Sequence, residues 1–224
     1  DWNNIILDWE KHRVLKISPK MSDYLEITSR SRVPTWDKSW RYNDNKFRWD
    51  IVLYVKWWKL VVVNELPIED YLKWLWEISD WENKEKIKTI IIAARSYATR
   101  YTTDARKFPW EWYDWSDDPW VFQKYLWYSL ETRSPKINRI VDETSGQYIT
   151  YNWKLIKPWY SSSSWWKTLS YEEYCKNNKN KADFCEKEAR KYPFLMWVKD
   201  PSDKKIAKNW HWVGISWAWT SYLS

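Results

Sequence analysis

The sequence predicts an α+β fold with a β-rich N-terminal part, built from short strands, and a central helix. Residues 1–63 contain short apolar or alternating runs separated by turn-like stretches, which is typical of strands. Apolar residues spaced three and four apart then follow between residues 80 and 104, which indicates a helix. The chain has 224 residues, enough to bury a sizeable core, and 30% of them are charged.

The N-terminal part is expected to hold five strands. The candidate runs are Ile5–Leu7, Val14–Ile17, Tyr24–Ile27, Ile51–Val55 and Leu60–Val63. The polar run of residues 30–45 reads as an exposed loop between the third and fourth strands.

Two helices are expected next. Pro67 and the acids Glu69 and Asp70 suit the first turn of a short helix, Ile68–Leu75. Ser79 and Glu82 have the spacing of a capping box, which predicts that a long helix begins near Asp80 and runs to about residue 104. Its expected core-facing stripe is Ile87, Ile90, Ile91, Ala94, Ala98 and Tyr101.

The second half of the chain gives weaker patterns. Residues 105–135 read as irregular, 139–151 and 155–161 as strands, and 171–190 as a charged helix. Cys175 and Cys185 form either a disulfide, as an exported protein permits, or two free thiols. They and the two histidines lack the pair spacing of a metal site, so we expect no metal and no cofactor.

The composition has one anomaly, which is 24 tryptophans against two glycines. Glycine normally supplies ~7% of residues, which would be about 16 here. Trp57-Trp58 separates two predicted strands, where Gly-Gly would make a good hairpin turn. Asn152-Trp153 has the same problem, since Asn-Gly is the strongest hairpin signal.

Our hypothesis is that most of these tryptophans are glycines in the natural protein. Some bacterial lineages read the UGA codon as glycine, and a different translation table prints such codons as tryptophan. Trp112, Trp120 and Trp159 are the ones we expect to be genuine, because they have aromatic or proline neighbours and no turn role. The alternative is a genuinely tryptophan-rich carbohydrate-binding module.

With glycine at the turn positions, a series of motifs appears in order between Val61 and Thr220. They are EDYLKGLGEIS (69–79), AARSYA (93–98), TSGQYITYNGK (144–154), YSSSSGGKT (160–168) and NGHGVGISGAGT (209–220). This order resembles the SpoIID/LytB family, the stage II sporulation protein D-like peptidoglycan lytic transglycosylases. The resemblance implies a SpoIID-like domain with residues 64–224 as catalytic core and residues 1–63 as its β-rich N-terminal part. We expect more of the domain to follow Ser224.

The resemblance places the family's catalytic glutamate at Glu77. The local pattern agrees, because Glu77 lies in the loop before the capped helix, with glycines expected at 74 and 76 to admit a polysaccharide. A lytic transglycosylase uses one carboxylate, which protonates the glycosidic oxygen and then takes a proton from the sugar's own C6 hydroxyl. Glycoside hydrolases instead pair two carboxylates. The acid has to keep its proton near neutral pH, so it needs apolar surroundings.

Three further residues of the matching motifs are candidates for substrate contact. Arg95, in AARSYA, is expected to contact substrate or to position Glu77, with a structural salt bridge as the alternative. The segment DDPWVFQKY (117–125) resembles a family element with a glutamine and a tyrosine. Gln123 and Tyr125 are therefore expected to bind sugar through an amide and a stacking ring.

The last two motifs supply the remaining candidates. The polar loop holds Tyr160, Ser162, Ser163 and Ser164, which are expected to bind N-acetyl groups, unless this is a flexible exposed loop. His211 and Ser216 are expected to bind substrate or support the site, with a core histidine as the alternative. The family's glutamine after the serine is residue 217 here, a tryptophan, so that glutamine's role is in doubt.

Together these features predict an extracytoplasmic peptidoglycan lytic transglycosylase, secreted or anchored through a segment outside this sequence. Its expected partner is the glycan strand, and an amidase is a second candidate, because the alternative function is a non-catalytic peptidoglycan-binding amidase activator. Sporulation and general wall remodelling both remain open. The net charge of +7 favours anionic partners, but the basic residues are dispersed and no nucleic-acid motif occurs. No apolar run reaches the ~18 residues of a membrane span.

Overall fold

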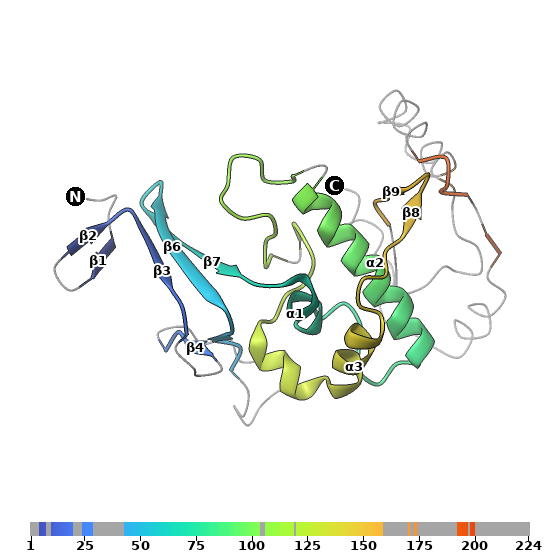
Figure 1. Cartoon of the computed structure of the whole chain (residues 1–224), viewed down its shortest axis with the longest axis horizontal. Coiled ribbons are helices and arrows are strands. Elements are labelled where there is room, and N and C mark those ends of the chain that lie inside the picture. The colour runs from blue at the N-terminus through green and yellow to red at the C-terminus, as the bar shows by residue number, and fades with distance from the viewer. Residues whose placement is uncertain are drawn as a thin grey trace. The chain divides into compact units, whose positions relative to one another are not determined.

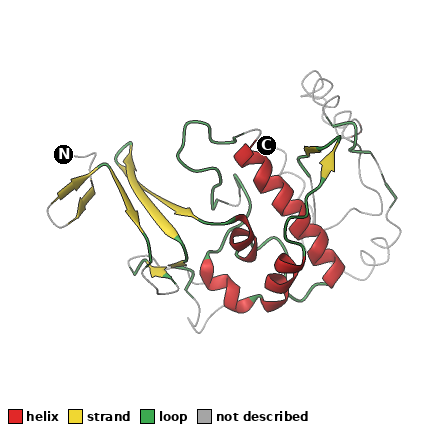
Figure 2. Ribbon diagram, viewed as in Figure 1, coloured by secondary structure: helices red, strands yellow, loops and turns green. Residues whose placement is uncertain are grey.

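The computed structural model describes residues 5–7, 10–19, 24–28, 43–103, 106–118 and 120–158, together with 170, 173, 192–196 and 198–199. The chain divides into two compact units, Asp1–Pro158 and Trp159–Ser224. Nearly all of the described residues belong to the first unit. This unit combines strands and helices, so the predicted α+β class is confirmed (Figure 2).

The largest sheet has three antiparallel strands, β3 (Val14–Ile17), β6 (Asp50–Lys56) and β7 (Lys59–Glu65), with β6 in the centre (Figure 1). A two-residue turn joins β6 to β7, and Lys56 pairs with Lys59 across it. The side chains of Ile51, Val52 and Tyr54 on β6 are buried. The three strands lie where the alternating runs predicted them, with β6 and β7 slightly longer than expected.

Three two-stranded antiparallel ladders complete the β structure of the described residues. They pair β1 (Ile5–Leu7) with β2 (Glu10–His12), β4 (Leu25–Glu26) with β5 (Lys46–Phe47), and β8 (Thr150–Tyr151) with β9 (Lys154–Leu155).

The helical part holds α1 (Ile68–Lys73), α2 (Lys84–Thr103), the 3-10 helix η1 (Tyr128–Arg133) and α3 (Pro135–Glu143). The core forms where these helices meet, with Leu72, Ile87, Ala94 and Ile140 fully or almost fully buried. On α2 the buried positions include the predicted stripe at 87, 91, 94 and 98, while Ile90 and Tyr101 are half-buried. The 3.6-residue periodicity therefore identified the correct face of this helix.

The start of α2 differs from the prediction. The helix begins at Lys84 and not near Asp80, because Asn83 is its capping residue: the Asn83 Oδ1 accepts a hydrogen bond from the Glu85 N–H at 2.8 Å. Asp80 caps a different helix, since its Oδ1 accepts from the Ile137 N–H of α3 at 2.7 Å.

The strand predicted at 139–151 is also wrong over most of its length. Residues Pro135–Glu143 form α3, with proline at its first turn and Ile137, Ile140 and Val141 buried on one face. Their spacing of three and four is helical, and only Thr150–Tyr151 is extended. Of the strand predicted at 155–161, Leu155 is in β9 and residues 156–158 are not in a strand.

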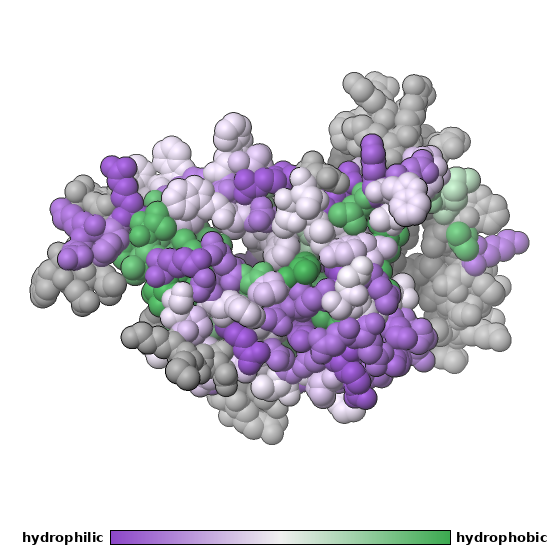
Figure 3. All heavy atoms as spheres, viewed as in Figure 1, coloured by the Kyte–Doolittle hydropathy of each residue, from purple (hydrophilic) through white to green (hydrophobic). Residues whose placement is uncertain are grey.

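The surface of this unit is unevenly hydrophilic. On the face seen in Figure 3, hydrophobic side chains show over the β3–β6–β7 sheet, and strongly hydrophilic ones lie over the lower parts of α2 and α3. Exposed apolar residues of the sheet include Val14, Ile17 and Leu60. No helix in the described part of the chain is long and apolar enough to cross a membrane.

Candidate active site

Glu77 lies in the short connection between α1 and α2, and backbone pairing fixes this connection to a segment far along the chain. Leu75 forms an antiparallel bridge with Tyr125. The Trp76 N–H donates to the Lys124 carbonyl at 2.8 Å, and the Leu126 N–H donates to the Trp74 carbonyl at 2.9 Å. The bridge holds the residue before Glu77 in a defined position.

The Glu77 carboxylate itself contacts the same segment. Its Oε1 accepts a hydrogen bond from the Lys124 N–H at 2.7 Å. The side chain is half-buried, next to the buried residues Leu75 and Ile78. A carboxylate held by a backbone N–H has a restricted orientation, and partial burial leaves it within reach of a ligand.

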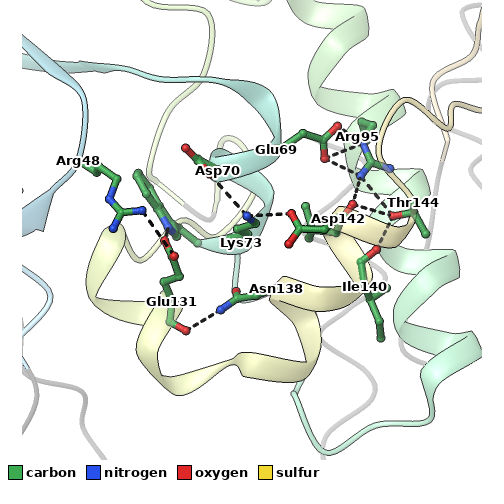
Figure 4. Close-up of polar contacts among 12 residues, drawn as sticks. Arg48, Glu69, Asp70, Lys73, Arg95, Glu131, Asn138, Ile140, Asp142 and Thr144 are labelled. Atoms are coloured by element: carbon green, nitrogen blue, oxygen red, sulfur yellow. Dashed lines mark hydrogen bonds and ion pairs between the residues drawn. The ribbon is translucent and has the colours of Figure 1, made fainter. Parts of the chain in front are cut away.

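Arg95 occupies a different environment, shown in Figure 4. Its side chain is fully buried and pairs with Glu69 of α1, with Nε–Oε1 at 3.0 Å and Nη2–Oε2 at 2.7 Å. The guanidinium also donates to the Val141 carbonyl at 3.2 Å, to the Thr144 Oγ1 at 3.3 Å and to the Gln147 carbonyl at 3.3 Å. These contacts join α1, α2 and the end of α3. They are the contacts expected of a structural salt bridge, which the sequence analysis gave as the alternative role of Arg95.

Gln123 and Tyr125 are both buried, so their side chains do not face solvent in this structure. The Tyr71 hydroxyl donates to the Gln123 Oε1 at 3.1 Å, and the Gln123 Nε2 donates to the Ala94 carbonyl at 3.4 Å. The Tyr125 ring stacks on Tyr71 at 5.3 Å between centroids. Together these contacts attach the 123–126 segment to α1 and α2.

The Tyr125 hydroxyl completes this attachment. It donates to the Asn64 Oδ1 at 3.1 Å, at the end of β7. Burial raises the pKa of this hydroxyl well above its ordinary value, and the negative charges of Asp117 and Asp70 act in the same direction. Tyr125 is therefore a neutral hydrogen-bond donor over the whole physiological range.

The other predicted site residues lie outside the described part of the chain. They are Tyr160, Ser162, Ser163, Ser164, His211 and Ser216. Cys175 and Cys185 lie outside it as well. The structure therefore brings together Glu77 and the 123–126 segment, and it places Arg95 in a separate cluster.

Sequence reasoning missed two participants. The helix-start pattern predicts Glu69 only as a first-turn acid, whereas in the structure it pairs with Arg95, because a buried arginine needs an acidic partner. The contact of Lys124 with Glu77 uses a backbone N–H, which no side-chain pattern can indicate. Within the described residues no group of His, Cys, Asp and Glu has the arrangement of a metal site.

Residues 58–151 match the family model of SpoIID, described as a stage II sporulation protein. A SpoIID domain occupies this segment. It contains Glu77, Lys124, Arg95 and its partner Glu69, so both clusters belong to it. No curated protein matches the chain significantly. The SpoIID domain supports a sporulation-related role associated with peptidoglycan.

Proposed function

We propose that this protein is a peptidoglycan lytic transglycosylase with Glu77 as its general acid and base. The observation that supports this most is the anchored Glu77 carboxylate, which lies within the segment that matches SpoIID. The motif resemblance predicts this glutamate as the catalytic one. SpoIID proteins are associated with cell-wall lysis, which agrees with this chemistry.

The reaction needs one group that first donates and then accepts a proton. Protonated Glu77 gives its proton to the oxygen between MurNAc and GlcNAc, and the bond from that oxygen to the MurNAc C1 breaks. The carboxylate then removes the proton from the C6 hydroxyl of the same MurNAc, and O6 bonds to C1 to close a 1,6-anhydro ring. No water is consumed, and Glu77 ends protonated as it began.

The bridge to Tyr125 serves this reaction by keeping the carboxylate in place. A general acid must lie within hydrogen-bond reach of the glycosidic oxygen, and small displacements of a catalytic group are costly. Gln123 and Tyr125 act in this proposal as positioning residues behind the segment that holds Glu77. Arg95 and Glu69 stabilise the helices on either side of the Glu77 loop.

The test is a digestion of isolated peptidoglycan sacculi, with and without their stem peptides, followed by mass spectrometry of the products. The wild-type protein should release muropeptides that end in 1,6-anhydro-MurNAc, and Glu77→Gln should not. Glu85→Gln is the matched control, since Glu85 is an exposed carboxylate in the first turn of α2.

Three outcomes would contradict the proposal. Full activity of Glu77→Gln would exclude Glu77 as the acid. Wild-type protein that binds sacculi without cleaving them, and that accelerates an added amidase, would favour the non-catalytic activator. Products that end in reducing MurNAc would indicate hydrolysis instead of transglycosylation.

A further inference from the structure

The backbone of this protein adopts the left-handed region at an unusual set of residues. Among the described residues, six that are not glycine have a positive φ, and five of these are tryptophan. They are Trp49 (70°), Trp57 (50°), Trp58 (61°), Trp127 (62°) and Trp153 (62°). A bulky L-residue is a clear outlier there, because its Cβ approaches the following carbonyl oxygen.

The tryptophans differ in this respect from the rest of the chain. Twelve tryptophans are described, so five of twelve have a positive φ. Among the described residues of all other types, only Asn152 and Gly146 have a positive φ. Asparagine tolerates this conformation, and Gly146 is a glycine, with φ of 72°. Positive φ is thus concentrated at tryptophan, a residue type that is poorly suited to this conformation.

Three of the five positions form hairpin turns that call for glycine. Trp57 and Trp58 are the two-residue loop between β6 and β7, and positive φ at both central residues defines a type I′ turn. Asn152-Trp153 forms the same turn between β8 and β9, where Asn-Gly is the preferred pair. The three indole side chains gain little from packing, since they are 75%, 71% and 98% exposed.

Trp127 is the most restrictive position. Its φ of 62° and ψ of −176° lie in a region that is essentially confined to glycine. It directly follows the 124–126 segment that contacts the Glu77 loop and precedes η1.

We infer that residues 49, 57, 58, 127 and 153 are glycines in the protein that its own cell makes, because the codon printed there as tryptophan is read as glycine. The other described tryptophans have no positive φ, so the backbone conformation gives no reason to assign glycine to them. Trp115 has an ordinary φ, stacks on Tyr71 at 4.2 Å and donates its indole N–H to the Ala98 carbonyl at 3.1 Å. The inference uses backbone conformation only and is independent of the proposed enzymatic activity.

The direct experiment is tandem mass spectrometry of the native protein, combined with the gene's codons at the five positions. Glycine in the peptides, encoded by UGA, supports the inference. Tryptophan in those peptides, or UGG codons at these positions, overturns it.

A second experiment tests the physical argument on the printed sequence. Trp57→Gly, Trp58→Gly and Trp153→Gly should each raise Tm by about 2–4 °C, because they relieve backbone strain and give up little burial. Trp81→Gly is the matched control, since Trp81 is 95% exposed and its φ is not positive. Glycine there should lower Tm slightly through its greater freedom in the unfolded chain. Equal responses at Trp81 and at the three turn positions would overturn the argument.

Discussion

The Glu77 loop and the Arg95 cluster lie within one SpoIID domain, but the two ionisable side chains differ in their burial and in their hydrogen-bond partners. Glu77 is half-buried, and a backbone N–H from a distant segment holds its carboxylate. Arg95 is fully buried, with hydrogen bonds to Glu69, to two backbone carbonyls and to a hydroxyl.

This difference in burial decides which of the two side chains is accessible to a ligand and which one stabilises the packing of the helices. A fully buried, fully paired guanidinium has no surface to offer a ligand, and breaking its pair leaves an uncompensated charge. A half-buried carboxylate with a fixed orientation keeps access to a substrate. In the proposed function, the same segment uses the Arg95 charge for packing and the Glu77 carboxyl group for chemistry.

The largest effect is expected at Glu77. Glu77→Gln should lower the rate of anhydro-muropeptide release by at least about 100-fold, since general acid–base catalysis contributes 10²–10⁴-fold. Its Tm should stay close to that of the wild type, because the amide oxygen still accepts from the Lys124 N–H. Glu85→Gln should change neither quantity. A Tm loss that parallels the rate loss would show that Glu77 is structural.

Arg95 should show the reverse behaviour. Arg95→Met is expected to lower the free energy of unfolding by roughly 3–5 kcal/mol, because Glu69 and two carbonyls lose their partner. Chemical denaturation measures this loss. Arg106→Met is the control, since Arg106 pairs with Asp114 on the surface, where an ion pair contributes about 0–1 kcal/mol. A stable Arg95→Met with lost substrate binding would instead make Arg95 a binding residue.

Substitution of Gln123 is expected to reduce both stability and activity, whereas Glu77→Gln affects mainly activity and Arg95→Met mainly stability. Gln123→Leu should cost about 1–3 kcal/mol, because the buried Ala94 carbonyl and Tyr71 hydroxyl lose a hydrogen bond. As a positioning residue it should also lower kcat more than it changes KM. Gln147→Leu, at an exposed side chain, should stay within ~0.5 kcal/mol of the wild type. A raised KM with unchanged stability would mean that Gln123 contacts sugar.

The smallest effect belongs to an exposed ion cluster in the sheet. Hydrogen bonds from Lys16, and secondarily from Ser18, lower the pKa of Asp50 below its ordinary value of 3.8. A lowered folded pKa stabilises the fold above the unfolded pKa, and this contribution is lost as pH falls through the folded pKa. Lys16→Gln should therefore lower Tm slightly at pH 7, and the difference should shrink below pH 4. Lys59→Gln, at an exposed lysine, should show no such pH dependence.

Local patterns predicted the fold where neighbouring residues decide the structure. The Ile87 to Ala98 stripe identified the buried face of α2, and the alternating runs identified β3, β6 and β7. Local patterns failed at Asp80 and at 139–151. Ser79 and Glu82 have the capping spacing, but Asp80 caps α3, 57 residues away. The apolar residues at 137, 140 and 141 have helical spacing, and packing against α1 and α2 buries them.

The sequence by itself determined the α+β class, the position of Glu77 before a long helix, and the mismatch between abundant tryptophan and rare glycine. Tertiary structure decided how Glu77 is held, because its partner is a backbone N–H 47 residues along the chain. It also decided that Arg95 pairs with Glu69, 26 residues earlier. Residue identity and short-range periodicity act locally, while these hydrogen bonds exist only after distant segments have packed together. At Trp57, Trp58 and Trp153 the sequence and the tertiary structure agree. The sequence predicts hairpin turns at these residues, and the folded backbone has the positive φ angles that such turns require.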